Sequence, residues 1–235
     1  MPSVAVLAAL VAVAFVALPL VGLVQRVPWT SIWHDLRDPA ATAALRLSIV
    51  TSLWSTFFAL AFGVPLAWVL ARVSFPGRSL MRAVTLLPMV LPPVVGGVGL
   101  LYAFGRSGFV GRYLYDWFGV QLTFRTAGAV MAETFVAMPF LVITVESALR
   151  SMDRRYEDAA ATLGASRLTV FRRVTVPAIA PGLIAGTALA WARALGEFGA
   201  TITFAGNIQG KTQTMPLAVS IAVLALLRDR WLGAG

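Results

Sequence analysis

Long apolar runs, separated by short segments that hold most of the charges, limit the fold of this 235-residue chain more than any other feature. A helix needs about 20 consecutive apolar residues to cross the hydrocarbon core of a membrane. Four runs reach that length, a fifth contains two charges and a sixth is short; they are residues 4–24, 47–71, 83–104, 127–149, 178–206 and 215–227. We therefore predict an all-α, polytopic membrane protein with five to six transmembrane helices, in a single domain over residues 1–235.

The composition agrees with a membrane protein and excludes several kinds of site. Hydrophobic residues make up 59% of the chain and charged residues 12%, whereas soluble domains contain about 25% charged residues. Cysteine is absent and the single histidine is His34, which excludes a disulfide framework and a thiolate or imidazole metal site. We expect no metal, no cofactor and no catalytic residue. The net charge of +9 lies mostly between apolar runs, so we expect contact with membrane lipid and not with nucleic acid.

The basic residues between the runs predict the orientation in the membrane, because cytoplasmic loops carry an excess of Lys and Arg. One side holds 11 of them: Arg72, Arg78, Arg82, Arg150, Arg154, Arg155, Arg167, Arg172, Arg173, Arg228 and Arg230. The other side holds seven: Arg26, Arg37, Arg46, Arg106, Arg112, Arg125 and Lys211. The first run lacks a basic start and a following A-x-A-like site, so we expect a retained helix. Both termini and residues 150–177 are then expected in the cytoplasm.

Residues 150–177, called the elbow below, interrupt the apolar sequence with the polar stretch YEDAAATLGASRLTVFRRVTVP at 156–177. Asp153 is placed to cap a helix that runs to Leu163, and Gly164 occupies the left-handed stop position. Ser166 is placed to cap a second short helix to about Val174, which Pro177 then limits. The pattern predicts a helix-turn-helix. It serves equally well as a docking surface for another protein and as an amphipathic connector on lipid headgroups.

The elbow resembles the signature of bacterial ABC importer permeases, in which Glu-Ala-Ala, three residues, Gly and nine residues precede Ile-x-Leu-Pro. This chain has Asp for Glu and Val for Ile and Leu at that spacing. The matching positions and the neighbouring acid are Glu157, Asp158, Ala159, Ala160, Gly164, Val174 and Pro177. The resemblance implies that these residues couple the protein to a separate subunit that hydrolyses ATP.

Two further stretches narrow the resemblance. ARALGEFGATITFAGNIQGKTQTMPLA at 192–218 and LLPMVLPPVVGGVGLLYAFGRSG at 86–108 are similar to the molybdate, tungstate and sulfate branch of these permeases, most of all to molybdate permeases. The resemblance implies a translocation subunit in a bacterial plasma membrane. It also implies two ATP-binding cassette subunits, an extracytoplasmic oxyanion-binding protein and a second copy of this chain as partners. Permeases of this branch continue further after the PLA segment, so we expect a shortened last span at 215–227.

Charged and hydroxyl side chains in the fifth run are candidates for the translocation pathway. Arg193 and Glu197 are four residues apart on one helix face at mid-membrane depth, where each charge needs a partner or water. They form either a structural ion pair or a source of positive potential for an anion. Thr201 and Thr203 could donate hydrogen bonds to an oxyanion. In the fourth run, Glu146 is expected to pair with Arg150, and Glu133 to meet Arg125 or solvent.

Small residues and prolines predict close packing and a kink. Gly182, Gly186, Ala190 and Ala194 recur at every fourth position and predict a packing face, against either a helix of this chain or a second copy. The third run contains Pro88, Pro92 and Pro93, which predict a kinked helix or a break that lines a cavity.

Two other functions account for parts of the sequence. An ion-coupled secondary transporter would use Glu133, Arg193 and Glu197 as a relay, but it gives no reason for the spacing in the elbow. An intramembrane enzyme would need a nucleophile or metal set, which the sequence does not offer. AGNIQGKT at 205–212 resembles a phosphate-binding loop but lacks the first glycine and the preceding strand, so the chain is not expected to hydrolyse ATP.

Overall fold

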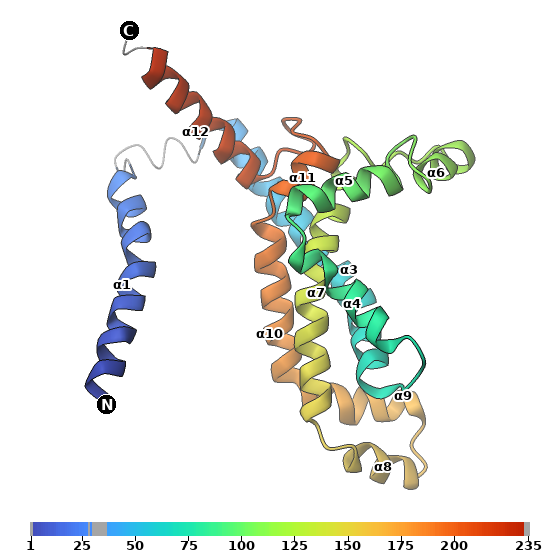
Figure 1. Cartoon of the computed structure of the whole chain (residues 1–235). Helices are drawn as coiled ribbons and strands as arrows, with labels where there is room; N and C mark the ends of the chain where they lie inside the picture. The colour runs from blue at the N-terminus through green and yellow to red at the C-terminus, as the bar shows by residue number, and fades with distance from the viewer. Residues whose placement is uncertain (1, 28, 30–36, 233–235) are drawn as a thin grey trace. The chain divides into compact units, whose positions relative to one another are not determined.

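The computed structural model describes residues 2–27, 29 and 37–232, and His34 lies outside them. In these residues every regular element is a helix and no strand occurs (Figure 1). The elements are α1 (Pro2–Arg26), α3 (Pro39–Arg72), α4 (Arg78–Val90), α5 (Pro93–Phe104), α6 (Gly111–Phe118), α7 (Thr126–Ser151), α8 (Arg155–Thr162), α9 (Arg167–Val170), the π-helix η1 (Phe171–Thr175), α10 (Val176–Leu195), α11 (Gly199–Phe204) and α12 (Met215–Leu232). The predicted all-α fold is confirmed.

The chain forms two compact units, Met1–Thr42 and Ala43–Gly235. The first contains α1, of which Val4–Gln25 is long and apolar enough to cross a membrane, in agreement with the predicted run at 4–24. The second contains the helices from α4 onward and most of α3. That residues 1–235 form a single domain stays a prediction.

Within the described residues, α1, α3 and α7 are long and apolar enough to span a membrane, and two bent helix pairs raise the number to as many as five. The bent pairs are Arg78–Val90 with Pro93–Phe104, and Arg167–Ala178 with Ala180–Leu195. The apolar part of α12, Met215–Leu224, is shorter than these. The chain is therefore a multi-pass membrane protein with interrupted helices among its spans.

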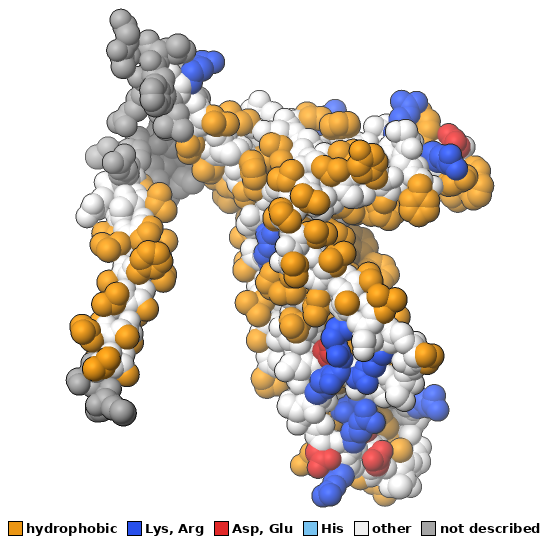
Figure 2. Space-filling model, in the orientation of Figure 1, with side chains coloured by type: hydrophobic (Ala, Val, Ile, Leu, Met, Phe, Trp, Pro, Cys, Tyr) orange, Lys and Arg blue, Asp and Glu red, His pale blue; other side chains and the backbone are white. Residues whose placement is uncertain are grey.

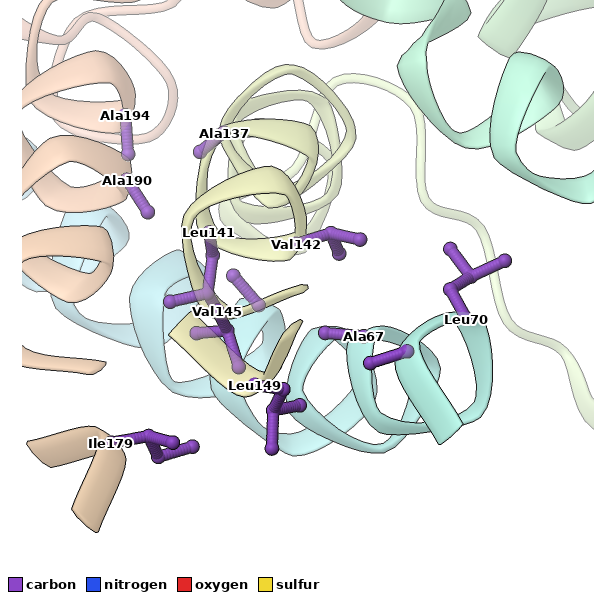
Figure 3. Close-up of a cluster of buried hydrophobic side chains, with 12 residues drawn as sticks. Ala67, Leu70, Ala137, Leu141, Val142, Val145, Leu149, Ile179, Ala190 and Ala194 are labelled. Carbon is purple, nitrogen blue, oxygen red and sulfur yellow. The ribbon is translucent and has the colours of Figure 1, made fainter. Parts of the chain in front are cut away.

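Helix α7 is the centre of the second unit, with α10 running beside it (Figure 1). Side chains from α3, α7 and α10 converge in the main hydrophobic cluster, with Leu141, Val145 and Leu149 of α7 fully buried (Figure 3). The predicted small-residue face of α10 packs on α7 of this same chain: a Cβ at Gly182 would lie 2.5 Å from the Cβ of Ala148. Small side chains thus let the two helices approach closely.

The third predicted run is a sharp break and not a continuous kinked helix. Helices α4 and α5 meet at 119° across Leu91 and Pro92. Both residues have extended backbones, with ψ of 138° and 132°. The residue before a proline is forced out of the helical region, and the pair Pro92–Pro93 imposes this twice. The two helices therefore lie at a steep angle to one another.

The prediction that residues 178–206 form one continuous helix is wrong. Helix α10 ends at Leu195, and α11 begins at Gly199. The carboxylate of Glu197 accepts a hydrogen bond of 2.8 Å from the backbone N–H of Ala200. A side-chain acceptor for the first N–H groups of a new helix favours a restart at this point. The interruption makes α10–α11 a second broken helix, which lies beside the broken helix α4–α5.

Candidate functional site

Helix α8 is the first of the two helices in the elbow. The predicted start signal lies at its N-terminal end and the predicted stop signal at its C-terminal end. Asp153 accepts a hydrogen bond of 3.0 Å from the backbone N–H of Arg155. At the other end Gly164 has φ of +82°, with the N–H of Gly164 bonded to Ala161 O and that of Ala165 to Ala160 O. This pair of bonds is a Schellman motif, which needs a left-handed residue at the glycine position. The predicted helix and its stop are confirmed.

The second arm begins as predicted and continues further. Ser166 caps α9 by accepting a hydrogen bond of 3.3 Å from the N–H of Thr169. The helix then widens into η1, where the N–H of Val176 bonds to Phe171 O, and passes into α10. Pro177 lies in the first turn of α10 and so does not end the helix. A proline lacks an N–H and crowds the carbonyl four residues earlier, which explains the wide turn directly before it.

Polar bonds join the elbow to the end of α3. Glu157 Oε2 lies 3.3 Å from Arg72 Nη2, and Glu157 Oε1 accepts a hydrogen bond of 2.7 Å from the hydroxyl of Thr175. Arg154 Nη2 lies 3.4 Å from the carbonyl oxygens of both Ala71 and Arg72. Glu157 is therefore directed into the protein, although the sequence placed it with the residues that couple to a partner.

The outer surface of α8 is exposed and partly apolar. Leu163 is 88% exposed and Tyr156 65%, and the small residue Ala159 lies between them on the same helical face. Charged side chains surround this part of the second unit, whereas the surface above it is largely hydrophobic (Figure 2). Contiguous apolar patches with a polar rim mark interaction sites for other proteins, and this small strip on α8 is a candidate for one.

A cluster of arginines surrounds the end of α3. Arg78 donates to Leu70 O at 2.8 Å through Nε, and Arg150 Nη2 reaches the same carbonyl at 3.4 Å. Glu146 accepts hydrogen bonds from Arg82 and from Arg150, the latter at 2.8 Å. The predicted Glu146–Arg150 pair is confirmed, and Arg82 was missed because α4 is distant in the sequence. Cations at a helix C-terminus are stabilised by the unpaired carbonyls and the helix dipole.

At the opposite end of the unit, the two broken helices pack against one another. A Cβ at Gly97 of α5 would lie 2.7 Å from Thr203 Cβ and 2.9 Å from Ala200 O. A Cβ at Gly199 would lie 3.0 Å from Pro93 Cβ. Only glycine permits such an approach of the two backbones. The breaks in α4–α5 and α10–α11 are thus brought together by glycines from both.

The four predicted pathway residues lie in or beside this region. Arg193 Nη1 and Glu197 Oε2 are 2.5 Å apart, with the glutamate side chain 1% exposed and the arginine 27%. Thr203 donates to Gly199 O at 2.8 Å. Thr201 is fully buried, and its hydroxyl is among the buried polar atoms of the described residues that have no hydrogen-bond partner. The structure therefore pairs the two charges, buries the hydroxyl of Thr201, and binds the hydroxyl of the half-buried Thr203 to the backbone of its own helix.

Sequence reasoning missed a buried polar stripe on α3. Ser48, Thr51, Ser52 and Ser55 are each no more than 1% exposed. Thr51 donates a 2.8 Å hydrogen bond to Glu133, which is itself buried, so the expectation that Glu133 meets Arg125 or solvent was wrong. The recurrence of hydroxyl residues on one face of an apolar run could have indicated a polar seam between helices.

Comparisons with known proteins bear on what this arrangement does. The family described as binding-protein-dependent transport system inner membrane component matches residues 63–228. The molybdenum transport system permease protein ModB of Mycobacterium bovis is 50% identical over 213 residues, which are 91% of this chain and 80% of that protein. The sulfate transport system permease protein CysT of Salmonella typhimurium is 40% identical over 207 residues, 87% of this chain and 74% of its own length.

One solved structure supports the fold. A bacterial ABC transporter involved in the import of the acidic polysaccharide alginate aligns with a TM-score of 0.56 at 20% identity, over 83% of this chain and 62% of that one. At this identity the likeness concerns the fold alone. The resemblance drawn from the elbow and from residues 192–218 is confirmed by the relatives.

Proposed function

The chain belongs to the family of binding-protein-dependent transport system inner membrane components, and we propose that it is the translocation subunit of an ATP-driven importer for molybdate. The observation that carries the mechanism is the folded elbow, whose caps and exposed apolar face suit docking to a partner outside the membrane. The 50% identity with a molybdenum permease supports the choice of cargo.

The energy source is a separate subunit. We expect ATP hydrolysis in two ATP-binding cassette subunits, with no catalytic residue in this chain. A second copy of the chain would complete the pathway, and an extracytoplasmic binding protein would deliver the anion. The excess of basic residues on the elbow side supports a cytoplasmic location of the elbow and of both termini in a bacterial cell.

The ATPase-facing surface is the outer face of α8. Tyr156, Ala159 and Leu163 lie on it, and an apolar side chain that is 88% exposed in water favours burial against a protein. Asp158, Ala160, Gly164, Val174 and Pro177 belong to the same coupling element. Of these, Gly164 shapes the turn through its positive φ, and Pro177 shapes the wide turn before α10. We expect motion of the ATPase to displace α8 as a unit.

The pathway follows the two broken helices. Irregular backbone at membrane depth is tolerated where it is buried in protein or lines a water-filled cavity. Breaks of this kind form substrate sites in other transporters. Arg193 and Glu197 cancel most of one another's field at 2.5 Å, so we assign them a structural role at the edge of the pathway. Thr201 has an unpartnered hydroxyl and would reach an anion only when α11 moves.

Sulfate is the second candidate cargo. A sulfate permease is 40% identical to the chain, and sulfate and molybdate are both tetrahedral dianions. Selection between them would lie mostly with the delivery protein, because the described part of the pathway pairs Arg193 internally.

Reconstitution tests the proposal. The chain is placed in liposomes with its cognate ATPase and binding proteins, and molybdate uptake is measured by metal analysis, with radiolabelled sulfate in a parallel arm. We expect uptake that needs ATP and all three proteins. Uptake by the chain alone, driven by a proton gradient, would establish the ion-coupled transporter instead. Preferential sulfate uptake would change the cargo and leave the mechanism intact.

A further inference from the structure

Helix α8 is held in place by polar contacts, since it buries no side chain of its own. None of its eight residues is buried. Its inner face borders a cavity of about 310 Å³ that is also lined by Trp68 of α3 and Phe171 of η1. A short helix that buries no apolar side chain gains little stability from packing. Its orientation therefore depends on the bonds that Glu157 and Arg154 make.

Glu157 joins three segments that are distant in the sequence. It is ion-paired to Arg72 at the end of α3 and accepts a hydrogen bond from Thr175, the last residue of η1 before α10 begins. The Thr175 residue is 1% exposed, and the side chains of Arg72 and Glu157 are 8% and 18% exposed. We call these three residues the latch.

Arg72 depends on this carboxylate. Its Nε and Nη2 atoms are buried and belong to the described side-chain atoms that make no hydrogen bond. A buried charge without compensation is strongly unfavourable. Glu157 is the acidic partner of Arg72 at 3.3 Å, so the ion pair is needed for Arg72 to stay inside the protein. Loss of either residue leaves the other without a counter-charge.

The wide turn of η1 determines where Thr175 lies. Thr175 is the last residue of η1, where Val176 N–H bonds to a carbonyl five residues earlier. A π-turn inserts one residue into the helix and so changes the direction of the side chains that follow. The same turn leads into α10, which means that the hydroxyl of Thr175 connects Glu157 to a membrane helix.

We propose that the latch makes the elbow a rigid extension of α3 and α10, so that a displacement of α8 moves these two helices instead of bending the elbow. The inference rests on the proposed function of the elbow as the ATPase-coupling element. Arg154 adds a second attachment near the first, on the carbonyls of Ala71 and Arg72. Glu157 is in this view a positioning residue, and it does not contact the ATPase.

The test measures elbow mobility and coupling separately. The chain has no cysteine, so a single nitroxide at Thr162→Cys, an exposed position on α8, reports its motion in the full chain in nanodiscs. We expect Arg72→Gln or Glu157→Gln to increase the label's mobility. In the reconstituted complex we expect the anions transported per ATP hydrolysed to fall by about 2- to 30-fold, while ATPase subunits still co-purify. The charge swap Arg72→Glu with Glu157→Arg should restore both values toward wild type.

Two further variants, Arg155→Gln and Thr175→Val, separate the effect of the latch from general effects of removing a charge. Arg155→Gln removes an arginine from the same helix whose side chain is 91% exposed, and both values should stay as in wild type. Thr175→Val is nearly isosteric and leaves no unpaired charge, so it still tests the latch if the charge variants do not insert. An unchanged label mobility and coupling ratio in Thr175→Val and Glu157→Gln would overturn the latch. If the wild-type chain binds no ATPase, the proposed function fails, whereas the mobility measurement still decides on the latch.

Discussion

The hydroxyl of Thr51 lies 2.8 Å from the carboxylate of Glu133 and donates a hydrogen bond to it, which joins α3 to α7 inside the second unit. The other oxygen of this carboxylate, Oε2, is one of the buried atoms without a hydrogen-bond partner among the residues described. Glu133 therefore depends on one side-chain donor from another helix. This dependence gives the first prediction.

Thr51→Val removes that donor and leaves the buried carboxylate unsatisfied. We expect a loss of about 1–3 kcal/mol in the free energy of unfolding, measured by thermal or denaturant unfolding in detergent. Thr134→Val is the control, because among the described residues the hydroxyl of Thr134 bonds to Val130 O of its own helix and to no other helix. Equal stability of the two variants would show that the Thr51 bond contributes nothing.

Gly164→Val places a β-branched residue at φ of +82°, in the turn between α8 and α9. No atom of the described residues lies within 4 Å of a Cβ at this position, so the expected cost is backbone strain of about 1–2 kcal/mol or more. We expect normal membrane insertion but reduced uptake in vesicles. Gly164→Asn should keep most of the activity, because asparagine tolerates the left-handed region. Full uptake by Gly164→Val would argue against the coupling role of the elbow.

Gly97→Ala tests the contact between the broken helices. The added Cβ would meet Thr203 Cβ at 2.7 Å and Ala200 O at 2.9 Å, which forces the backbones apart. We expect a destabilisation of about 1–3 kcal/mol and slower transport. Gly99→Ala, on the same helix with no atom within 4 Å of its Cβ, is the matched control. The prediction fails if both variants melt at the same temperature.

Arg193→Gln leaves the buried Glu197 carboxylate without its ion pair. We expect a loss of about 3–5 kcal/mol, as for other buried pairs that lose one partner. The double variant Arg193→Gln with Glu197→Gln removes both charges and keeps an acceptor for the Ala200 N–H, so stability and uptake should recover. A double variant that is stable but transports no molybdate would assign Arg193 to the anion pathway.

Leu163→Asp places a charge on the outer face of α8. An exposed leucine contributes little to the fold of the chain alone, so its melting temperature should not change. We expect affinity for the ATPase subunit to fall by about fivefold or more, measured by titration in nanodiscs. Arg155→Gln is again the control. Unchanged affinity would place the contact on another face of the elbow.

Much of the elbow was predictable because its signals are local. Asp153, Gly164 and Ser166 act on backbone groups within a few residues of themselves, so their positions in the sequence indicate the two helices and the turn. The apolar runs are likewise local, and α1, α3 and α7 contain the predicted spans at 4–24, 47–71 and 127–149. The interrupted runs were harder, because a proline or glycine predicts a break without the angle it produces.

A helical membrane protein with an elbow between two spans is readable from hydropathy, capping and turn residues, because these signals act over short distances along the chain. The folded structure was needed to show that Glu157 is directed inward to Arg72, that Thr51 reaches Glu133, and that Gly97 lets α11 approach closely. Each of these contacts joins segments that are far apart in the sequence. Such pairs form when several helices pack together, so no spacing along one helix encodes which neighbour it meets.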